Sequence, residues 1–401
     1  MLLLLLPLFS VCSGKNNTAD NAPEAEQEPS VAAVQEQDAI EPVAHDAVSD
    51  AMRREAARIV AGLDDRQLAA QVIISGIDGK GHLTSDMRML LTECPAGGIM
   101  LFRYNLDADN DAIQGLIAEA AAVASAAIPP FVAVDHEGGS VNRFRRGVAS
   151  LPPAGSYWEM TQNMDIDNVI NKIHRDSFYA GRAINGLGVN LNLAPVAEFL
   201  NENNRDFLDD RSYGPDTDFT AKAAAAFING MEQAGILCAV KHFPGSAGAD
   251  PHLFTSVLKD DKTTLAELVV PFAALIRSNH ARAIMVSHSA VPAVDSENIA
   301  SLSSAVMGGW LRDELGFAGI IICDDFSMAS AKSISLKPET AAVLSLAAGA
   351  DMVLVWPPDL RRTHRAIVAA LGSGELSRER LQEAAERIIF EKVRMGLVDG
   401  E

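Results

Sequence analysis

The sequence predicts an α/β fold, a (β/α)8 TIM barrel formed by a single domain. Short apolar runs rich in β-branched residues alternate with longer amphipathic segments from about Met52 to the end of the chain. Eight such runs can be counted, which is the number of strands in this barrel. A doubly wound open sheet is the alternative, but no GxGxxG motif follows the first run, as a dinucleotide-binding sheet would require.

The predicted strands are near-continuous apolar segments, the pattern expected of strands that are buried on both faces. In chain order they are residues 71–77, 97–102, 130–135, 188–195, 236–243, 282–287, 319–325 and 351–356. Helical patterns lie between them, for example DAIQGLIAEAAAVASA at 111–126 and TAKAAAAFINGMEQAG at 220–235. In such a barrel the chemistry lies where the strands end and the following loops begin.

The first residues, MLLLLLPLFSVCSG, form an apolar segment that is too short to span a bilayer and is typical of an export signal. The residues before Cys12 are similar to a lipobox, so Cys12 would carry a lipid; an ordinary cleaved signal is the alternative. We expect an export signal at 1–12, a disordered acidic linker at 13–51 and the barrel domain at 52–401. The protein is then exported, as a membrane-anchored lipoprotein or in a periplasmic or other extracytoplasmic space.

The composition of the chain argues against several classes of partner and cofactor. The formal net charge of −20 argues against nucleic-acid binding, which relies on clustered Lys and Arg, and 48% hydrophobic residues fit a globular protein. No CxxC spacing occurs, and Cys94, Cys238 and Cys323 leave an odd number of cysteines after Cys12, so neither a disulfide framework nor a zinc cluster is expected. We expect no metal, no cofactor and a monomer.

Polar residues follow five of the eight predicted strands and would converge on one mouth of the barrel. Loops after strands are polar in any case, so a single member could be incidental, but five strands ending in this way indicate a functional site. These residues are Asp135, His136 and Glu137; Glu198; Lys241 and His242; Ser287 and His288; and Asp324 and Asp325.

Two motifs offer ligand-binding groups. In VDHEGGSVNRF (134–144), Asp135 would point into the mouth and Arg143 follows it in the same loop. A turn closed by its own Asp–Arg ion pair is the alternative. In DDRSYG (209–214), Arg211 could clamp a ligand, although most arginines are simply solvated.

The segment KHFPGSAGADPH (241–252) combines Lys241 and His242 at a strand end with Asp250 and His252 further along the loop. Metal binding is disfavoured because no HExxH-type spacing occurs. An acid–base role fits, because Asp250 could orient His252 across a proline that fixes the backbone. An ordinary surface loop is the alternative.

The segment GIIICDDFSM (319–328) places two carboxylates at the end of an apolar strand. Because successive side chains alternate, only one of Asp324 and Asp325 can face the barrel axis. A carboxylate in this position suits attack on the anomeric carbon of a sugar. Capping of a following helix is the alternative role, above all for Asp325.

Taken together, these motifs resemble glycoside hydrolase family 3, and specifically its β-N-acetylhexosaminidase (β-N-acetylglucosaminidase) branch. The resemblance runs from about residue 65 to 398 and is carried by GGIMLF, VDHEGGSVNRF, NLNLAPV, DDRSYG, AVKHFPG, IMVSH, LSSAVMGGWLRDELGFAGIIICDDFSM and AGADMVLV. It implies a (β/α)8 barrel and a two-step retaining mechanism. The activity that it implies is removal of terminal N-acetylglucosamine from peptidoglycan fragments or other amino-sugar glycans, so the expected partner is a carbohydrate.

The resemblance also implies roles for single residues. Asp324 would be the nucleophile, and His252 the acid–base group, with Asp250 orienting it. A histidine with a pKa near its ordinary value, roughly 6.5, can both donate and accept a proton. The residues that would hold the sugar are Asp135, Arg143, Arg211, Lys241 and His242.

The chain departs from the family pattern in the loop that carries His252. This loop is shorter than is typical, Ser246 replaces a histidine, and Pro251 replaces a serine. Asn142 and Glu198 stand where glutamine and aspartate are common. Two alternatives therefore stay open: a β-N-acetylglucosaminide phosphorylase on the same scaffold, or a catalytically weakened sugar-binding lipoprotein.

Overall fold

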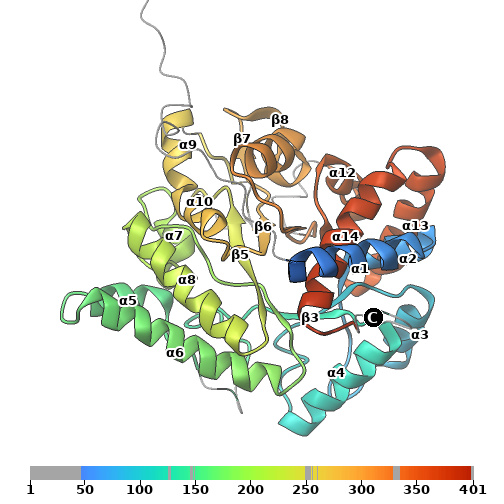
Figure 1. Ribbon diagram of the computed structural model, residues 1–401, viewed down its shortest axis with the longest axis horizontal. Helices are drawn as coiled ribbons and strands as arrows, with labels where there is room; N and C mark the ends of the chain where they lie inside the picture. The colour runs from blue at the N-terminus through green and yellow to red at the C-terminus, as the bar shows by residue number, and fades with distance from the viewer. Residues whose placement is uncertain are drawn as a thin grey trace, which may run out of the picture. The chain divides into compact units, whose positions relative to one another are not determined.

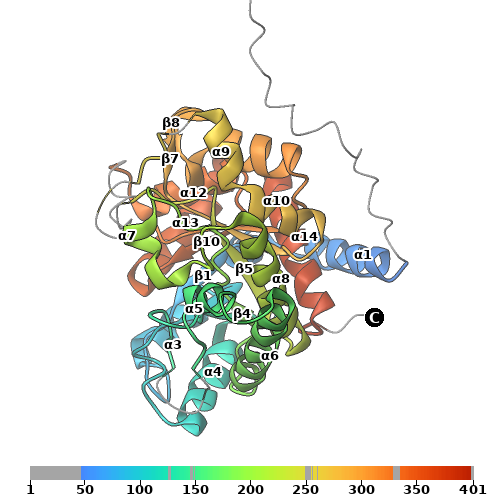
Figure 2. The same ribbon diagram turned by 90° about the vertical axis from the view of Figure 1, so that its left-hand side faces the viewer.

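The computed structural model describes residues 47–124, 128–144, 148, 150–248, 254, 256–259, 261–327 and 335–398. Eight parallel strands close into a barrel in the order β1-β10-β9-β6-β5-β4-β3-β2. Helices surround the strands, as two perpendicular views show (Figure 1 and Figure 2). The predicted (β/α)8 barrel is confirmed.

All barrel strands lie within the runs predicted from the sequence, and every residue in them is buried. Both faces are covered, one by the barrel interior and the other by helices, which explains why the runs are apolar throughout. The bounds are β1 (Ile73–Gly76), β2 (Gly98–Leu101), β3 (Phe131–Val134), β4 (Leu191–Asn192), β5 (Leu237–Phe243), β6 (Ala283–Val286), β9 (Ile320–Cys323) and β10 (Met352–Val355).

Helices of the described residues alternate with the barrel strands, as the sequence pattern predicts, and α1 and α2 precede β1. No helix among them is long and apolar enough to cross a membrane. Their bounds are α1 (Ala47–Ala61), α2 (Asp65–Gln71), α3 (Ser85–Glu93), α4 (Asn110–Ala124), α5 (Ala154–Met160), α6 (Ile166–Asn185), α7 (Arg205–Leu208), η2 (Asp209–Arg211), α8 (Thr217–Gln233), α9 (Lys262–Leu268), α10 (Val270–Arg277), η3 (Ala300–Leu302), η4 (Ala305–Glu314), α12 (Pro338–Ala348), α13 (Pro357–Ser373) and α14 (Arg378–Arg394).

The helix α1 begins inside the segment 13–51, which we predicted to be a disordered linker. Its residues Ala56 and Val60 are buried, and the helix packs against α14 from the other end of the chain. The helix thus begins before the predicted boundary at Met52, and its buried apolar residues lie beyond that boundary. The rest of the predicted linker and the predicted export signal lie outside the described residues.

A hairpin outside the barrel was not predicted. Its strands, β7 (Ala290–Val291) and β8 (Asp295–Ile299), are short and antiparallel and follow β6. β7 has only two residues, and β8 is polar with three consecutive exposed residues, so neither carries a strand signal. The hairpin bears on the site, since Val257 in the loop after β5 forms a β-bridge with Ala290.

Candidate active site

The mouth of the barrel holds a network of buried charges centred on Lys241, near the end of β5. The Lys241 Nζ atom lies 2.7 Å from Asp135 Oδ1 and 2.8 Å from Glu137 Oε1, and only 4% of the Lys241 side chain is exposed. Both carboxylates follow β3, on the far side of β4 in the barrel. A single ammonium group therefore links the ends of two strands across the mouth.

Two arginines extend this Lys241 network. Arg143 Nη2 donates to Asp135 Oδ2 at 3.1 Å. Arg211 donates to both oxygens of Glu137, through Nε at 2.8 Å and Nη2 at 2.9 Å. The structure thus brings together four of the residues predicted to hold a sugar, and the internal Asp–Arg ion pair that was the alternative for the first motif is also present.

Neighbouring charges fix the protonation of the Lys241 network. Burial alone would raise the pKa of Asp135, but the charges of Lys241 and Arg143 lower it below its usual range. Burial likewise would raise the pKa of Glu137, and Lys241 and Arg211 lower it strongly. Burial would lower the pKa of Lys241, yet the two carboxylates raise it. All these groups therefore stay charged at neutral pH.

His242 lies beside the network and has its own carboxylate partner. Its Nδ1 is 2.7 Å from Glu198 Oε1, and its backbone N–H donates to the same oxygen at 3.2 Å. Glu198 follows β4 and is 2% exposed. Because a carboxylate accepts the Nδ1 proton, Nε2 is the ring nitrogen left to meet a ligand.

The two aspartates after β9 have different surroundings. The carboxylate of Asp325 accepts hydrogen bonds from Trp356 Nε1 and from the backbone N–H of Ser327, and burial raises its pKa. Asp324 Oδ1 accepts only the backbone N–H of Asp325, at 2.8 Å, among the described residues. Asp325 is therefore held by protein donors, whereas the described residues give the Asp324 carboxylate one backbone donor.

A buried histidine supports the segment that carries these aspartates. His288 Nε2 donates to the carbonyl oxygen of Asp325 at 3.0 Å, and its Nδ1 is 2.7 Å from Ser301 Oγ. Burial lowers the pKa of His288, although the charges of Asp324 and Asp325 oppose this effect. A neutral ring with both nitrogens bonded thus fixes the backbone beside Asp324.

The predicted acid–base pair, Asp250 and His252, lies outside the described residues. The two ends of its loop are described and are joined to each other. The Ala247 N–H donates to Ser256 Oγ at 3.1 Å, and Ser289 Oγ donates to the same hydroxyl at 2.9 Å. The loop therefore starts and ends beside the segment that follows β6.

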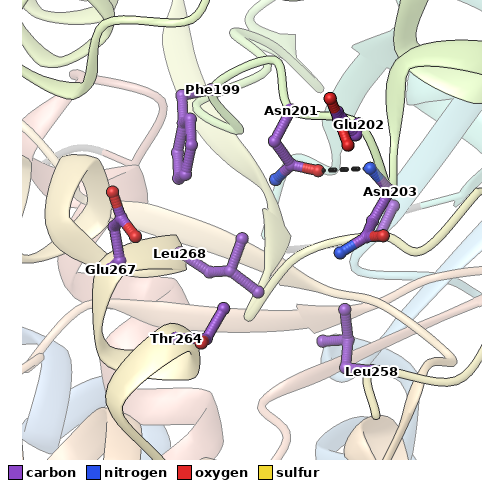
Figure 3. Close-up of a pocket in the computed structure, with 9 residues that line it drawn as sticks. Phe199, Asn201, Glu202, Asn203, Leu258, Thr264, Glu267 and Leu268 are labelled. Carbon is purple, nitrogen blue, oxygen red and sulfur yellow. Dashed lines mark hydrogen bonds between the residues drawn. The ribbon is translucent and has the colours of Figure 1, made fainter. Parts of the chain in front are cut away.

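A cavity of about 300 Å³ lies beside that loop. Figure 3 shows side chains of α9 on one side of it and the segment after β4 on the other. Phe199, which lines the cavity, is the chain neighbour of Glu198, whereas Glu198 and His242 themselves are not among the lining residues. It is lined by Phe199, Asn201, Glu202, Asn203, Ser246, Leu258, Thr264, Glu267 and Leu268.

Sequence reasoning placed Glu137, Glu198 and His288 at strand ends but assigned them no role. A role for Glu137 could have been inferred, because side chains two apart in extended backbone face the same way and Asp135 had been singled out. For Trp356, the one sequence signal is its position directly after β10. Within the described part of the chain, no three His, Cys, Asp or Glu side chains form a group that could hold a metal ion.

Comparison with known proteins decides the family. Residues 65–390 match the family described as "Glycosyl hydrolase family 3 N terminal domain". The chain belongs to glycosyl hydrolase family 3. The match covers every barrel strand and the motifs that carried the resemblance, which is thereby confirmed.

The relatives of this family 3 chain are named for activity on amino sugars. A beta-hexosaminidase from Idiomarina loihiensis is 35% identical over 280 residues, which is 68% of this chain and 80% of that protein. A family 3 beta-N-acetylglucosaminidase from Paenibacillus sp. str. FPU-7 has a TM-score of 0.76 and 30% identity, covering 85% of this chain but only 64% of its own. A beta-N-acetylhexosaminidase from Beutenbergia cavernae has a TM-score of 0.73 and 27% identity, covering 83% of this chain and 99% of its own. This family 3 chain is a glycosidase.

Proposed function

We propose that this family 3 glycosidase is a retaining β-N-acetylhexosaminidase that removes terminal N-acetylglucosamine from peptidoglycan fragments or other amino-sugar glycans. The observation that carries the proposal is the position of Asp324, after β9 at the same mouth as the Lys241 network. A carboxylate at the same barrel mouth as a set of hydroxyl-binding groups suits displacement at an anomeric carbon. The names of the relatives support an amino sugar as the substrate.

The proposed mechanism has two displacement steps. A carboxylate oxygen of Asp324 attacks the anomeric carbon and the bond to the leaving oxygen breaks, while that oxygen takes a proton from His252. In the second step His252 takes a proton from water, whose oxygen attacks the anomeric carbon and releases Asp324. Asp250 orients His252 in both steps. Two inversions return the starting configuration.

The Lys241 network would bind the sugar hydroxyl groups. Its charged donors and acceptors are already paired with one another, so little reorganisation is needed when a hydroxyl joins them. Asp135 is the more accessible of the two carboxylates, with 18% of its side chain exposed against 5% for Glu137. We therefore assign direct contact with the sugar to Asp135. Glu137 would instead hold Lys241 and Arg211 in position.

Hydrolysis of 4-nitrophenyl N-acetyl-β-glucosaminide tests the proposal. We expect turnover by the parent protein, a β-anomer as the first product in NMR, and a loss of about 10³-fold or more in Asp324→Asn. Asp313→Asn, which changes an exposed carboxylate on η4, should stay as active as the parent. A well-folded parent without turnover, or an Asp324→Asn variant as active as the parent, would contradict the proposal. Release of sugar 1-phosphate that depends on phosphate would favour the phosphorylase instead.

We also propose that the chain is exported and carries a lipid on Cys12. The apolar segment at 1–12 and the acidic composition that follows support this proposal. Growth with a radioactive fatty acid should label the parent in the membrane fraction but leave Cys12→Ala unlabelled. An unlabelled parent in the soluble extracytoplasmic fraction would favour an ordinary cleaved signal.

A further inference from the structure

Three aromatic rings lie in a row on the part of the barrel mouth that the mechanism does not use. Phe102 and Tyr104 follow β2, and Trp356 follows β10. The Phe102 ring is stacked on Trp356, with centroids 4.4 Å apart and planes 9° apart. It also lies nearly parallel to Tyr104, at 6.1 Å and 11°. Tyr104 is 42% exposed, and the other two residues are partly buried, so the aromatic row reaches the surface.

Close contacts hold the aromatic row in place. A Cβ atom on Gly76, at the end of β1, would lie 3.1 Å from the Phe102 ring, so the glycine makes room for that ring. The Tyr104 hydroxyl donates to the carbonyl oxygen of Ile77 at 2.7 Å. The side chain of Asn105, which is fully buried, accepts the Phe102 N–H at 2.8 Å. The rings are therefore a preformed surface rather than loosely held side chains.

The aromatic row connects directly to the reacting group. Trp356 Nε1 donates to the carboxylate of Asp325, and the Asp325 N–H donates to Asp324. In the closed barrel, β10, β1 and β2 form the arc between β9 and β3, whereas the Lys241 network belongs to β3 and β5. The mouth thus has a charged side and an aromatic side, and Asp324 follows β9, the strand next to β10 on the aromatic side and separated from β5 by β6 alone.

We propose that the aromatic row binds the sugar ring on the leaving-group side of the bond that is cleaved. Hexopyranose rings present C–H groups on their faces, and these pack against aromatic surfaces, whereas their hydroxyl groups need polar partners. The charged side supplies polar partners for the sugar that Asp324 attacks. The next ring then packs against Tyr104, the exposed member of the aromatic row, because Phe102 and Trp356 are stacked face to face and cover each other. This inference rests on the proposed function, because it assigns the second sugar of the same substrate.

The test compares two substrates that differ only in the leaving group. N,N′-diacetylchitobiose carries a second sugar ring, and N-acetyl-β-glucosaminyl fluoride carries none. In Tyr104→Ala we expect the ratio of kcat/KM for the disaccharide to that for the fluoride to fall about tenfold, the size of effect expected when one exposed stacking ring is lost. Tyr104→Phe keeps the ring and should keep the ratio. Tyr179→Ala removes a 61% exposed tyrosine on α6 and should also leave the ratio unchanged.

The outcomes separate the two proposals. An equal loss on both substrates in Tyr104→Ala would overturn the inference, since the ring would then serve the first sugar or the fold. An unchanged ratio in a protein that hydrolyses both substrates would overturn it as well. A parent that hydrolyses neither substrate would overturn the proposed function and, with it, the assignment of the aromatic row.

Discussion

Two buried lysines show how neighbouring groups decide the charge of the same side chain. Lys241 is 3% exposed and Lys392 is fully buried. Two carboxylates raise the pKa of Lys241, whereas burial lowers the pKa of Lys392 to about 7, because its partners are the uncharged oxygens of Gln71 and Gly97. Lys241 therefore stays charged at the mouth of the barrel, whereas Lys392 is only about half protonated at pH 7.

Replacing Glu137 by Gln should weaken both stability and activity. The amide is similar in size but neutral, so Arg211 would lose its ionic partner and Lys241 would keep only Asp135. Removing one partner of a buried ion pair costs about 3 kcal/mol or more. We expect a lower urea midpoint and a lower kcat/KM. Glu159→Gln, at an exposed position on α5, is the control and should change neither; an unchanged midpoint in Glu137→Gln would show that the network adds nothing to stability.

At the scale of single residues, the sequence shows which side chains lie at strand ends but not which of them contact each other. Asp135, Lys241 and Asp324 could be predicted because each follows an apolar run. The pairing of Glu198 with His242 could not, since it joins residues 44 apart in sequence through the register of two adjacent strands. Sequence position indicates which end of the barrel a side chain occupies, whereas the distances that set its protonation come from packing.

The opposite end of the barrel carries a second buried charge cluster that joins several elements. Asp351, directly before β10, is fully buried. Its Oδ1 accepts from Arg380 at 2.8 Å and from Arg387 at 3.0 Å, both on α14, and its Oδ2 accepts from Arg312 on η4. The Ile321 N–H of β9 donates to Oδ2 at 2.8 Å. One carboxylate therefore ties two helical segments to two strands.

Asp351→Asn should lower stability without changing the active site. Three arginines would then share a neutral partner, and the loss of a buried carboxylate costs about 3 kcal/mol. We expect a clear fall in Tm and an unchanged KM for the nitrophenyl substrate. Asp107→Asn, at a carboxylate that is 54% exposed and paired with Lys80, should cost less than about 0.5 kcal/mol. A raised KM in Asp351→Asn would mean that this cluster influences the mouth.

Elements were predictable to different degrees. The barrel strands were found because burial on both faces leaves runs that are apolar at every position. The hairpin β7–β8 was missed because it packs on one side only and β8 (Asp295–Ile299) reads as polar. The start of α1 carries a weak apolar pattern, because among the side chains of α1 whose burial is described Ala56 and Val60 are the buried ones. Half-buried elements leave a weaker pattern than buried ones.

Across the whole barrel domain, the carboxyl ends of the strands carry the candidate active site, whereas the amino ends carry stabilising contacts. The charged network, Asp324 and the aromatic row lie at the carboxyl ends of the strands, as in other barrels of this kind. At the amino ends, Lys392 reaches inward from α14, donating to Gln71 Oε1 and to the carbonyl oxygen of Gly97, each at 2.9 Å. Its Nζ lies 5.2 Å from the centroid of the Phe131 ring on β3. The last helix, α14, is thus tied to the amino ends of the strands through the buried Lys392.

The protonation of Lys392 makes the stability of the barrel depend on pH in a definite direction. The pKa of Lys392 is about 7 in the folded protein, and its ordinary value is 10.5. Between these values the unfolded chain binds a proton that the folded chain does not, so the contribution of Lys392 to stability rises with pH. Below about pH 7 both states are protonated and the buried charge destabilises the fold by its full amount.

Lys392→Met should remove this dependence. Buried thiols such as Cys238, whose pKa burial raises, titrate in the same range, so the quantity to measure is the difference in unfolding free energy between the two proteins. We expect Lys392→Met to gain stability relative to the parent at pH 7, and this relative advantage to shrink steadily toward pH 10. Urea unfolding at several pH values measures it. Parallel curves would mean that Lys392 stays charged in the fold, held by its two oxygen acceptors and the face of Phe131.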